Sequence, residues 1–190
     1  MIVYFTAAAS LKAEYGEAYT KIISLLEELG HKVIHKHVTE QDKPKIDKSS
    51  ATERNDYYSQ VLKWISDADL VVAELSFPST LNVGHEVTLA IDKGKPVIGL
   101  YAQGRQSTFF QGIKSDKFVY EEYSSDTLKS ILEEALAYAQ ENSDTRFNFI
   151  VPHSILDYLD WVAKTKNLPR SVYLRTLIEQ DKKKNKDYKG

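Results

Sequence analysis

The sequence has no cysteine among its 190 residues. This absence excludes disulfides, thiolate nucleophiles and cysteine-bound metal sites together. Long apolar runs are missing too: no stretch approaches the roughly 18 consecutive apolar residues of a transmembrane helix, and the N-terminus lacks the basic and apolar regions of a signal peptide. We therefore expect a cytoplasmic protein. The five histidines are scattered along the chain, so we expect neither a metal site nor a cofactor.

The net charge is only -2, but it is unevenly distributed. Residues 144–190 hold 10 lysines and arginines against 6 acidic residues, whereas residues 1–143 hold 15 against 21. Such an asymmetry indicates two modules with different partners, and the basic module is the candidate for binding a polyanion. For residues 183–190 alone, a solvated basic tail is the simpler interpretation.

A hydrophobic content of 42% is enough to bury a core, and the length of 190 residues predicts one medium domain with a small appendage. Apolar runs predict five strands, at Ile2–Phe5, Val33–Val38, Leu70–Ala73, Val97–Tyr101 and Lys117–Tyr120, of which the first, third and fourth should be buried. Periodic segments between and after them predict helices, among them one ending at Gly30, Asp56–Ser66, Val83–Lys93 and one capped by Ser124. Strands that alternate with helices predict a doubly wound α/β fold with a parallel sheet of order 2-1-3-4-5. This order places a ligand crevice at the carboxyl ends of strands 1 and 3.

Two features surround the second predicted strand. His35 and His37 alternate along it and would point to one face, but no third ligand is near, and two histidines on a strand are more often solvated than metal-bound. The polar, lysine-rich stretch Thr39–Thr52 then predicts a long surface loop. We expect no chemistry from the two histidines.

The loops after strands 1 and 3 meet at the predicted crevice. The second loop leads into a helix, whose free backbone N–H groups and dipole favour phosphate or another anion. Glu86 would lie in the first turn of this helix and face the ligand. Neutral hydrogen bonds are available from Ser79, Thr80 and Asn82, and Gly84 permits close approach of backbone or ligand.

Three segments carry a resemblance to a known family: Tyr4 on strand 1, Asn82-Val83-Gly84-His85-Glu86, and Gly94-Lys95-Pro96-Val97. Residues 1–142 resemble the nucleoside 2-deoxyribosyltransferases and, more closely, the 2'-deoxynucleoside 5'-phosphate N-hydrolases, which have a flavodoxin-like fold. The resemblance implies that Glu86 attacks the anomeric carbon of the deoxyribose, that Tyr4 positions it, and that Thr80 touches the 5' end of the sugar or its phosphate. The substrate-binding residues expected from the loops and the resemblance together are Thr6, Ser10, Ser79, Thr80, Asn82, Gly84 and His85.

A carboxylate suits this chemistry for the reason that it serves retaining glycosidases. It stabilises an oxocarbenium-like transition state and then forms a covalent glycosyl ester, which water or a second base opens. The alternative role for Glu86 is purely structural, namely charge–dipole stabilisation of a helix N-terminus.

One position departs from the family pattern. Family members usually carry an aspartate eight residues before the position of Asp69, and here that residue is Val61. Tyr57 and Tyr58 share the helical face of Val61 and are candidates for lining the site, although ordinary packing against the sheet accounts for them equally well. Base protonation and substrate orientation therefore lack an assigned residue, and the first loop, Thr6–Ser10, lacks the glycines common in the hydrolases.

After a polar linker, residues 146–182 resemble a ribbon-helix-helix unit, a dimeric fold in which one strand from each chain pairs over interlocked helices. The matching features are the alternation of Phe147, Phe149 and Val151, followed by two predicted helices, Ser154–Lys166 and Arg170–Lys182. If the unit binds DNA, the resemblance places Arg146, Asn148 and Ile150 in the major groove and Ser171 on a phosphate. A dimerisation clamp without DNA remains the alternative, and either role requires a second chain.

The sequence thus leaves two functional hypotheses. The first is an N-glycosidase or deoxyribosyltransferase that acts on 2'-deoxynucleosides or their 5'-monophosphates through a covalent Glu86 intermediate. The second is a non-catalytic, nucleotide-sensing transcriptional regulator with a DNA-binding ribbon-helix-helix module. Under both we expect a homodimer, or a homotetramer if the two modules pair with different neighbours.

Overall fold

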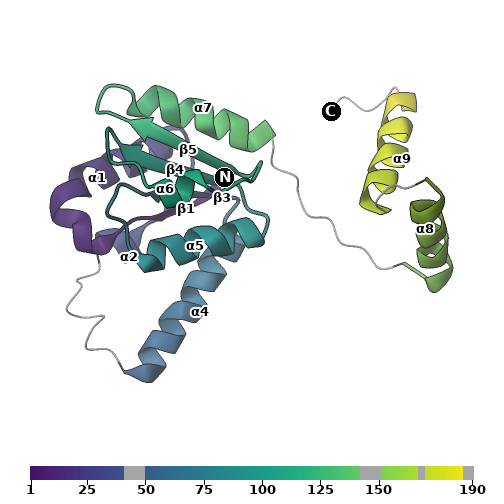
Figure 1. Ribbon diagram of the computed structural model, residues 1–190, viewed down its shortest axis with the longest axis horizontal. Helices are drawn as coiled ribbons and strands as arrows, with labels where there is room; N and C mark the ends of the chain where they lie inside the picture. Colours follow the sequence, from purple (N-terminus) through teal and green to yellow (C-terminus); the bar gives the residue numbers. More distant parts are fainter. Residues whose placement is uncertain (41–49, 142–150, 167–169, 186–190) are drawn as a thin grey trace. The chain divides into compact units, whose positions relative to one another are not determined.

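The computed structural model describes residues 1–40, 50–141, 151–166 and 170–185. Contacts divide the chain into two units, Met1–Asp144 and Thr145–Gly190. The first unit contains a sheet flanked by helices, and the described part of the second contains two helices (Figure 1).

The sheet has five parallel strands in the order β2-β1-β3-β4-β5. The strands are β1 (Ile2–Thr6), β2 (Lys32–Ile34), β3 (Leu70–Glu74), β4 (Val97–Ala102) and β5 (Phe118–Tyr123). The predicted doubly wound α/β fold and strand order are therefore confirmed. Strand β1 lies between β2 and β3, with Tyr4 opposite Val71 and Thr6 opposite Ala73. This is the point where the winding reverses and where ligands bind in folds of this class.

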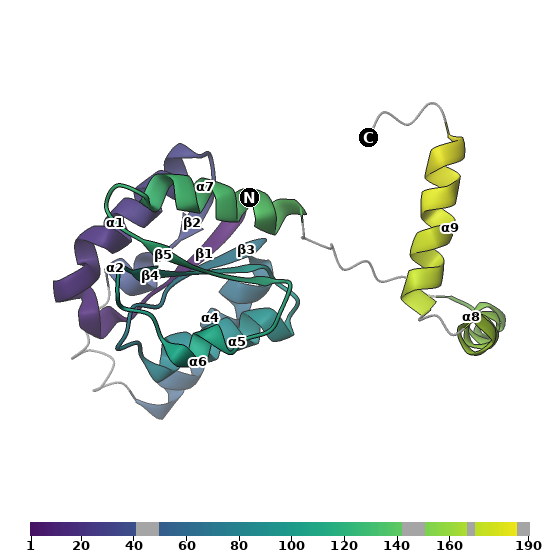
Figure 2. The ribbon, with the colours of Figure 1, turned by 45° about the horizontal axis from the view of Figure 1, so that its top comes forward.

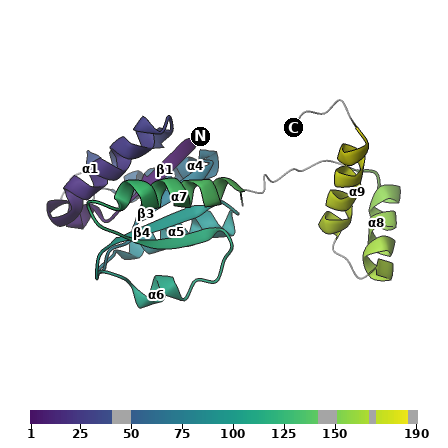
Figure 3. The same ribbon diagram turned by 90° about the horizontal axis from the view of Figure 1, so that it is seen from above.

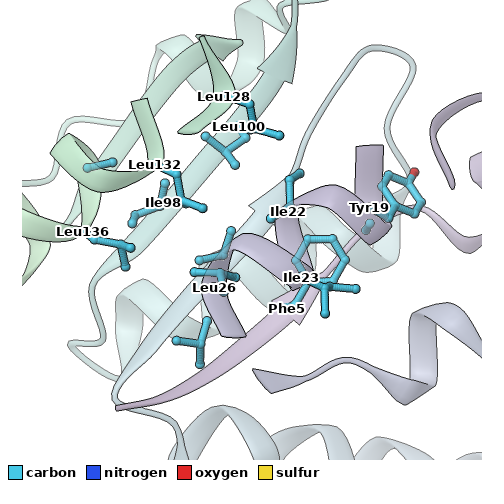
Figure 4. Close-up of a cluster of buried hydrophobic side chains, with 14 of the residues drawn as sticks. Phe5, Tyr19, Ile22, Ile23, Leu26, Ile98, Leu100, Leu128, Leu132 and Leu136 are labelled. Atoms are coloured by element: carbon cyan, nitrogen blue, oxygen red, sulfur yellow. The ribbon is translucent and has the colours of Figure 1, made fainter. Parts of the chain in front are cut away.

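Helices cover both faces of the sheet (Figure 2). Helices α1 (Lys12–Glu28) and α7 (Leu128–Glu141) lie on one face, and α4 (Ala51–Asp67) and α5 (Leu81–Asp92) on the other. Between α1, α7 and the sheet is a buried cluster that includes Phe5, Tyr19, Ile22, Leu26, Ile98, Leu100, Leu128 and Leu132 (Figure 4). A second buried cluster on the α4 and α5 face contains Tyr4, Val61, Ile65, Val71, Val83 and Val87. Tyr4 thus projects toward the face on which α5 presents Glu86.

Three short helical elements were not expected from the sequence: η1 (Ala9–Leu11), α2 (Lys36–Thr39) and α6 (Thr108–Gln111). Figure 3 shows α6 on the connection between β4 and β5. The second predicted strand, Val33–Val38, is wrong in its second half because the chain turns into α2 after Ile34. The turn is closed by backbone bonds from Val38 and Thr39 to the His35 carbonyl, and it buries Val38.

Helix α4 begins five residues earlier than the predicted Asp56. A capping box starts it: the Ser50 hydroxyl accepts from the Glu53 backbone N–H at 3.2 Å, and the Glu53 carboxylate accepts from the Ser50 N–H at 2.6 Å. These bonds satisfy two N–H groups that a helix start leaves unpaired. Of the predicted loop Thr39–Thr52, residues 41–49 lie outside the described residues.

The described part of the second unit is a pair of helices, α8 (His153–Lys166) and α9 (Arg170–Lys184). An ion pair joins Arg170 to Asp160, and the hydroxyls of Tyr158 and Tyr173 lie 3.3 Å apart. Leu159 and Val162 are buried, whereas Ile155, Leu177 and Ile178 are 42–66% exposed in the single chain. The predicted strand through residues 146–150 lies outside the described residues.

No helix in the described ranges is long and apolar enough to cross a membrane.

Candidate active site

The centre of the site is a hydrogen bond between β1 and α5. The hydroxyl of Tyr4 donates to Oε2 of Glu86 at 3.0 Å. Tyr4 is fully buried in the middle of the sheet, and Glu86 is half-buried on α5. The two residues expected to form the catalytic pair are therefore brought together across 82 positions of sequence.

Glu86 lies in the second turn of α5, not in the first as expected. The helix begins at Leu81, two residues before the predicted start, with Thr80 as its N-cap. The dipole at the helix N-terminus acts mainly within the first turn. A structural role for Glu86 as a dipole partner is therefore weakened, while its position beside Tyr4 is explained by the helical face that it occupies.

Burial raises the pKa of Glu86, and hydrogen bonds from Thr6 and Tyr4, together with nearby His85, partly offset this rise. Burial and the Glu86 carboxylate also raise the pKa of Tyr4, which keeps its hydroxyl protonated. Tyr4 is thus a fixed donor and Glu86 a carboxylate with a raised affinity for protons. A carboxylate of this kind has the character of a nucleophile or general base.

Aromatic rings fix the orientation of Tyr4. The imidazole of His37 stacks on the Tyr4 ring, with ring centroids 4.8 Å apart and planes inclined by 2°. The centroid of the Trp64 ring lies 5.1 Å from that of His37 and 6.4 Å from that of Tyr4. Tyr57 meets Trp64 edge-on at 6.5 Å. We call Tyr4, His37, Tyr57 and Trp64 the aromatic wall.

His37 corrects the sequence-based expectation. It lies on α2, not on a strand, and is only 7% exposed rather than solvated. Burial, with a smaller contribution from His35, lowers its pKa to about 4, so its ring is neutral near pH 7. Within the described part of the chain, neither ring nitrogen has a hydrogen-bond partner.

Helix α4 brings three residues of the expected face toward β1. Tyr57, Val61 and Trp64 all belong to or pack against the buried cluster of Tyr4, and Val61 is 4% exposed. Tyr58 instead lies at the surface, 47% exposed, where its hydroxyl is 3.1 Å from Nε2 of His85 and the rings are stacked. Trp64 was missed, although its spacing of three from Val61 places it on the same helical face.

The residues at the start of α5 surround its free N–H groups. The Thr80 side chain makes no capping bond, and Oγ of Ser79 is buried without a partner among the described residues. Asn82 is exposed. A Cβ at Gly84 would meet the Phe110 ring at 3.8 Å, an ordinary contact, so packing within the protein does not itself require glycine there.

The loop after β1 contributes unequally. Thr6 is 1% exposed, and its hydroxyl bonds to Glu86 and lowers the pKa of that carboxyl. Ser10 is exposed on η1. The structure therefore brings Thr6, but not Ser10, to Glu86.

A fully buried glutamate, Glu74, lies at the end of β3 and was not foreseen. Oε1 of Glu74 accepts hydrogen bonds from the backbone N–H of Ser76 at 3.3 Å, from the Tyr123 hydroxyl at 3.1 Å and from the Ser76 hydroxyl. The Ser76 hydroxyl in turn accepts from the N–H of Ala102 at 2.8 Å. This network ties the start of the loop that leads to α5 to strands β4 and β5.

Of the candidate DNA-facing residues, Arg146, Asn148 and Ile150 lie outside the described residues. Ser171 is the second residue of α9. The described ranges contain no group of three or more histidine, aspartate or glutamate side chains that would hold a metal ion.

Comparison with known proteins connects this geometry to a family. A family model for nucleoside 2-deoxyribosyltransferases matches residues 3–150. The chain is 34% identical to 5-hydroxymethyl-dUMP N-hydrolase of Rattus norvegicus over 99 residues, which cover 52% of this chain and 60% of that protein. It is 33% identical over 107 residues to a Thermofilum pendens protein named 2'-deoxynucleoside 5'-phosphate N-hydrolase 1, covering 55% of this chain and 72% of that protein.

Two solved structures share the fold. A CMP N-glycosidase of Clostridium botulinum superposes with a TM-score of 0.50 at 20% identity and covers 73% of this chain and 99% of its own. A 2-deoxyribosyltransferase of Bacillus psychrosaccharolyticus gives a TM-score of 0.52 at 14% identity and covers 70% and 96%. At such identities these likenesses establish the fold alone.

Proposed function

Because the chain belongs to the nucleoside 2-deoxyribosyltransferase family, we propose that it cleaves the N-glycosidic bond of 2'-deoxynucleosides or their 5'-monophosphates, with Glu86 as the nucleophile. The observation that carries this proposal is the 3.0 Å hydrogen bond from Tyr4 to a half-buried Glu86. A carboxylate held in one orientation by a hydroxyl that stays protonated is suited to attack an anomeric carbon.

The reaction proceeds in two steps. As the glycosidic bond lengthens, positive charge grows on C1' and the ring oxygen, and the Glu86 carboxylate stabilises it before forming a glycosyl ester. The electron pair of the broken bond leaves with the base. Water then opens the ester in a hydrolase, or a second base opens it in a transferase. A 2-deoxy sugar suits this path because it lacks the electron-withdrawing 2-hydroxyl.

The start of α5 supports a 5'-phosphate as the preferred substituent of the sugar. Its N-cap, Thr80, makes no side-chain capping bond, and Ser79 has a buried hydroxyl without a partner among the described residues. Free N–H groups at the N-terminus of a helix bind phosphate well. Thr80, Ser79 and Asn82 would add neutral hydrogen bonds, while Thr6 and Tyr4 orient Glu86. We assign His85, Gly84 and Ser10 to the border of the substrate site.

The decisive experiment is base release from a panel of deoxynucleosides and their 5'-monophosphates, measured by chromatography. Glu86→Gln and Glu86→Ala should lower release by several orders of magnitude while thermal unfolding shows a folded protein. Glu133→Gln, which changes an exposed glutamate on α7, is the matched control and should behave as the parent does. Unchanged release by the Glu86 variants would refute the nucleophile, and no release by the parent would refute the enzyme.

The second candidate function, a nucleotide-sensing regulator, is favoured by one observation: Val61 stands where the family pattern has an aspartate. In that role the first unit binds a nucleotide without turnover, and residues 146–182 bind DNA through a ribbon-helix-helix fold. Nucleotide binding measured by calorimetry, in the absence of any base release, would select this function over catalysis. Loss of DNA binding on Arg146→Ala would then identify Arg146 as a residue that contacts DNA.

We further propose that the chain assembles at least as a homodimer. Trp161 and Ile178 of the second unit are 58% and 66% exposed, and Leu81 and Phe109 of the first are 88% and 75% exposed. Apolar side chains exposed to this degree often mark protein interfaces. Light scattering of the full chain should therefore give a dimer or tetramer, and Ile178→Glu with Trp161→Glu should lower the oligomeric state by one step. A monomer at micromolar concentration would refute the assembly.

A further inference from the structure

The face of α4 that packs toward Tyr4 is formed by apolar and aromatic side chains. On α4, Val61 lies between Tyr57 and Trp64, and all three pack in or against the cluster that contains Tyr4. Tyr4 carries the hydroxyl that binds Glu86 at 3.0 Å. The side of the site formed by α4 is therefore apolar and aromatic, and at its centre is a valine that is 4% exposed.

A base attached to C1' within reach of Glu86 must lie within a few ångströms of that carboxylate, and a general acid must be within hydrogen-bond reach of the base. The two hydroxyl groups bonded to Glu86 and the imidazole of His37 do not supply one. The hydroxyls of Tyr4 and Thr6 already bond to Glu86, and burial together with Glu86 keeps the pKa of Tyr4 high. His37, on α2, has a pKa lowered by burial to about 4 and carries no acidic proton near pH 7.

Among the described residues, the other titratable groups around Glu86 include no carboxyl group that acts on it. His85, next to Glu86 on α5, lies within hydrogen-bond distance of the exposed Tyr58 hydroxyl at 3.1 Å. Tyr57 on α4 packs edge-on against Trp64 and lies near enough to Tyr4 to contribute to the raised pKa of the Tyr4 hydroxyl. Glu74 belongs to the network with Tyr123 and Ser76. Thus, from the described residues, the elements around Glu86 offer a nucleophile without a partnering carboxylic acid.

We propose that Val61 makes this enzyme dependent on the leaving ability of the base, so that it cleaves nucleotides whose base departs as a stabilised anion and discriminates against bases that need a proton. The inference rests on the proposed N-glycosidase function and adds a specificity-determining residue to it. In the first step the C1'–N bond breaks with its electron pair on the base nitrogen, while an oxygen of Glu86 bonds to C1'. The water that opens the ester gives its hydroxyl to C1' and its proton to the base anion, so the sum is nucleotide plus water giving free base plus sugar phosphate.

The test is a leaving-group series on the full-length chain. The 5'-monophosphates of 5-fluoro-, unsubstituted and 5-methyl-deoxyuridine and of deoxycytidine present bases of decreasing N–H acidity. Base release is measured in a single turnover, so that ester hydrolysis does not mask bond cleavage. Without acid assistance, the rate should fall steeply along the series, approaching about tenfold for each unit of base pKa.

Val61→Asp supplies the absent acid, and Val61→Asn is its near-isosteric, non-titrating control. The aspartate variant should flatten the series, accelerate deoxycytidine monophosphate more than the 5-fluoro substrate, and show a rate that falls as rising pH ionises the new carboxyl. In the asparagine variant, the rate should still fall steeply along the series. Circular dichroism and thermal unfolding check that both variants fold.

Each outcome decides the question. A flat series for the parent chain means that another group protonates the base and overturns the inference, whether or not the variants fold. If Val61→Asp is folded and active, and its rate depends on the pKa of the base as steeply as that of the parent, then Val61 does not determine specificity. Absence of base release from every substrate refutes the proposed function itself, a result distinct from a flat series.

Discussion

The hydrogen bond between Tyr4 and Glu86 makes a prediction that can be worked out from the structure. Tyr4→Phe removes one hydroxyl and keeps the ring, which stacks on His37 at 4.8 Å. The fully buried ring has no reason to move, so the main change is one fewer donor to the Glu86 carboxylate. Since this bond favours the ionised form, its loss raises the pKa of Glu86 beyond the rise that burial already causes.

The size of the effect follows from the strength of such a bond. A hydrogen bond to a charged group contributes about 1.5–3 kcal/mol, and one pKa unit corresponds to about 1.4 kcal/mol. The acid limb of kcat/KM should therefore move upward by about one to two pH units. Below the new pKa, activity should fall by roughly tenfold to a hundredfold, and part of the loss should be recovered as the pH rises above it.

The assay is the pH dependence of kcat/KM for the best substrate. Tyr123→Phe is a matched control because that hydroxyl also donates to a buried glutamate, Glu74, at 3.1 Å, but Tyr123 packs in the cluster on the other face of the sheet. Its profile should keep the acid limb of the parent. An unmoved acid limb in Tyr4→Phe, or an equal shift in Tyr123→Phe, would refute the view that Tyr4 sets the ionisation of the nucleophile.

Three further predictions concern stability. The pKa of His37 in the folded protein, about 4, lies below the ordinary 6.5, so the free energy of unfolding should fall by about 3 kcal/mol as the pH falls from 6.5 to 4. His37→Phe keeps an aromatic ring against Tyr4 and should reduce this loss, as measured by urea titrations at pH 7 and pH 4. Ser50→Ala removes one half of the capping box of α4 and should cost about 1 kcal/mol of unfolding free energy, while Ser50→Asp should retain most of it. Leu132→Ala, at a fully buried position on the inner face of α7, should lower the unfolding free energy by about 2–5 kcal/mol in chemical denaturation. A change at the exposed neighbour Glu133 should cost almost nothing, and equal costs would contradict the core assignment.

The architecture was predictable because its signals are local and repeated. Buried parallel strands are continuous apolar runs, and the amphipathic stripe of α7 keeps a helical period, so both can be recognised without knowledge of the partners that they pack against. Short elements such as α2 and α6 were not predictable in this way. A four-residue helix has too few positions to establish a period. The turn after Ile34 buries Val38 in the cluster that contains Phe5 and Tyr19, a contact that the local sequence does not indicate.

The site was predictable only in part for the same reason. The order of the strands predicted that the loops after β1 and β3 meet, and the family resemblance then paired Tyr4 with Glu86. His37 was assigned to a solvated strand, and only the turn into α2 brings its ring onto Tyr4. Trp64, by contrast, could have been recognised from its helical spacing to Val61. Site residues on long helices and strands can thus be predicted from the sequence, whereas His37, which a short irregular turn brings to the site, cannot.

The apolar residue at position 61 also has a consequence for Glu86 itself. A carboxylate on this face of α4 would lie in the cluster around Tyr4, close to the nucleophile. Two carboxylates that share a poorly solvated site raise each other's affinity for protons, so that one of them holds a proton at neutral pH. With Val61, the described surroundings of Glu86 contain no such competitor, and its pKa rises through burial alone while Tyr4, Thr6 and His85 oppose the rise. The valine therefore exchanges assistance to the leaving base for a nucleophile that ionises more readily, and Val61→Asp should move the acid limb of Glu86 upward at the same time as it flattens the leaving-group series.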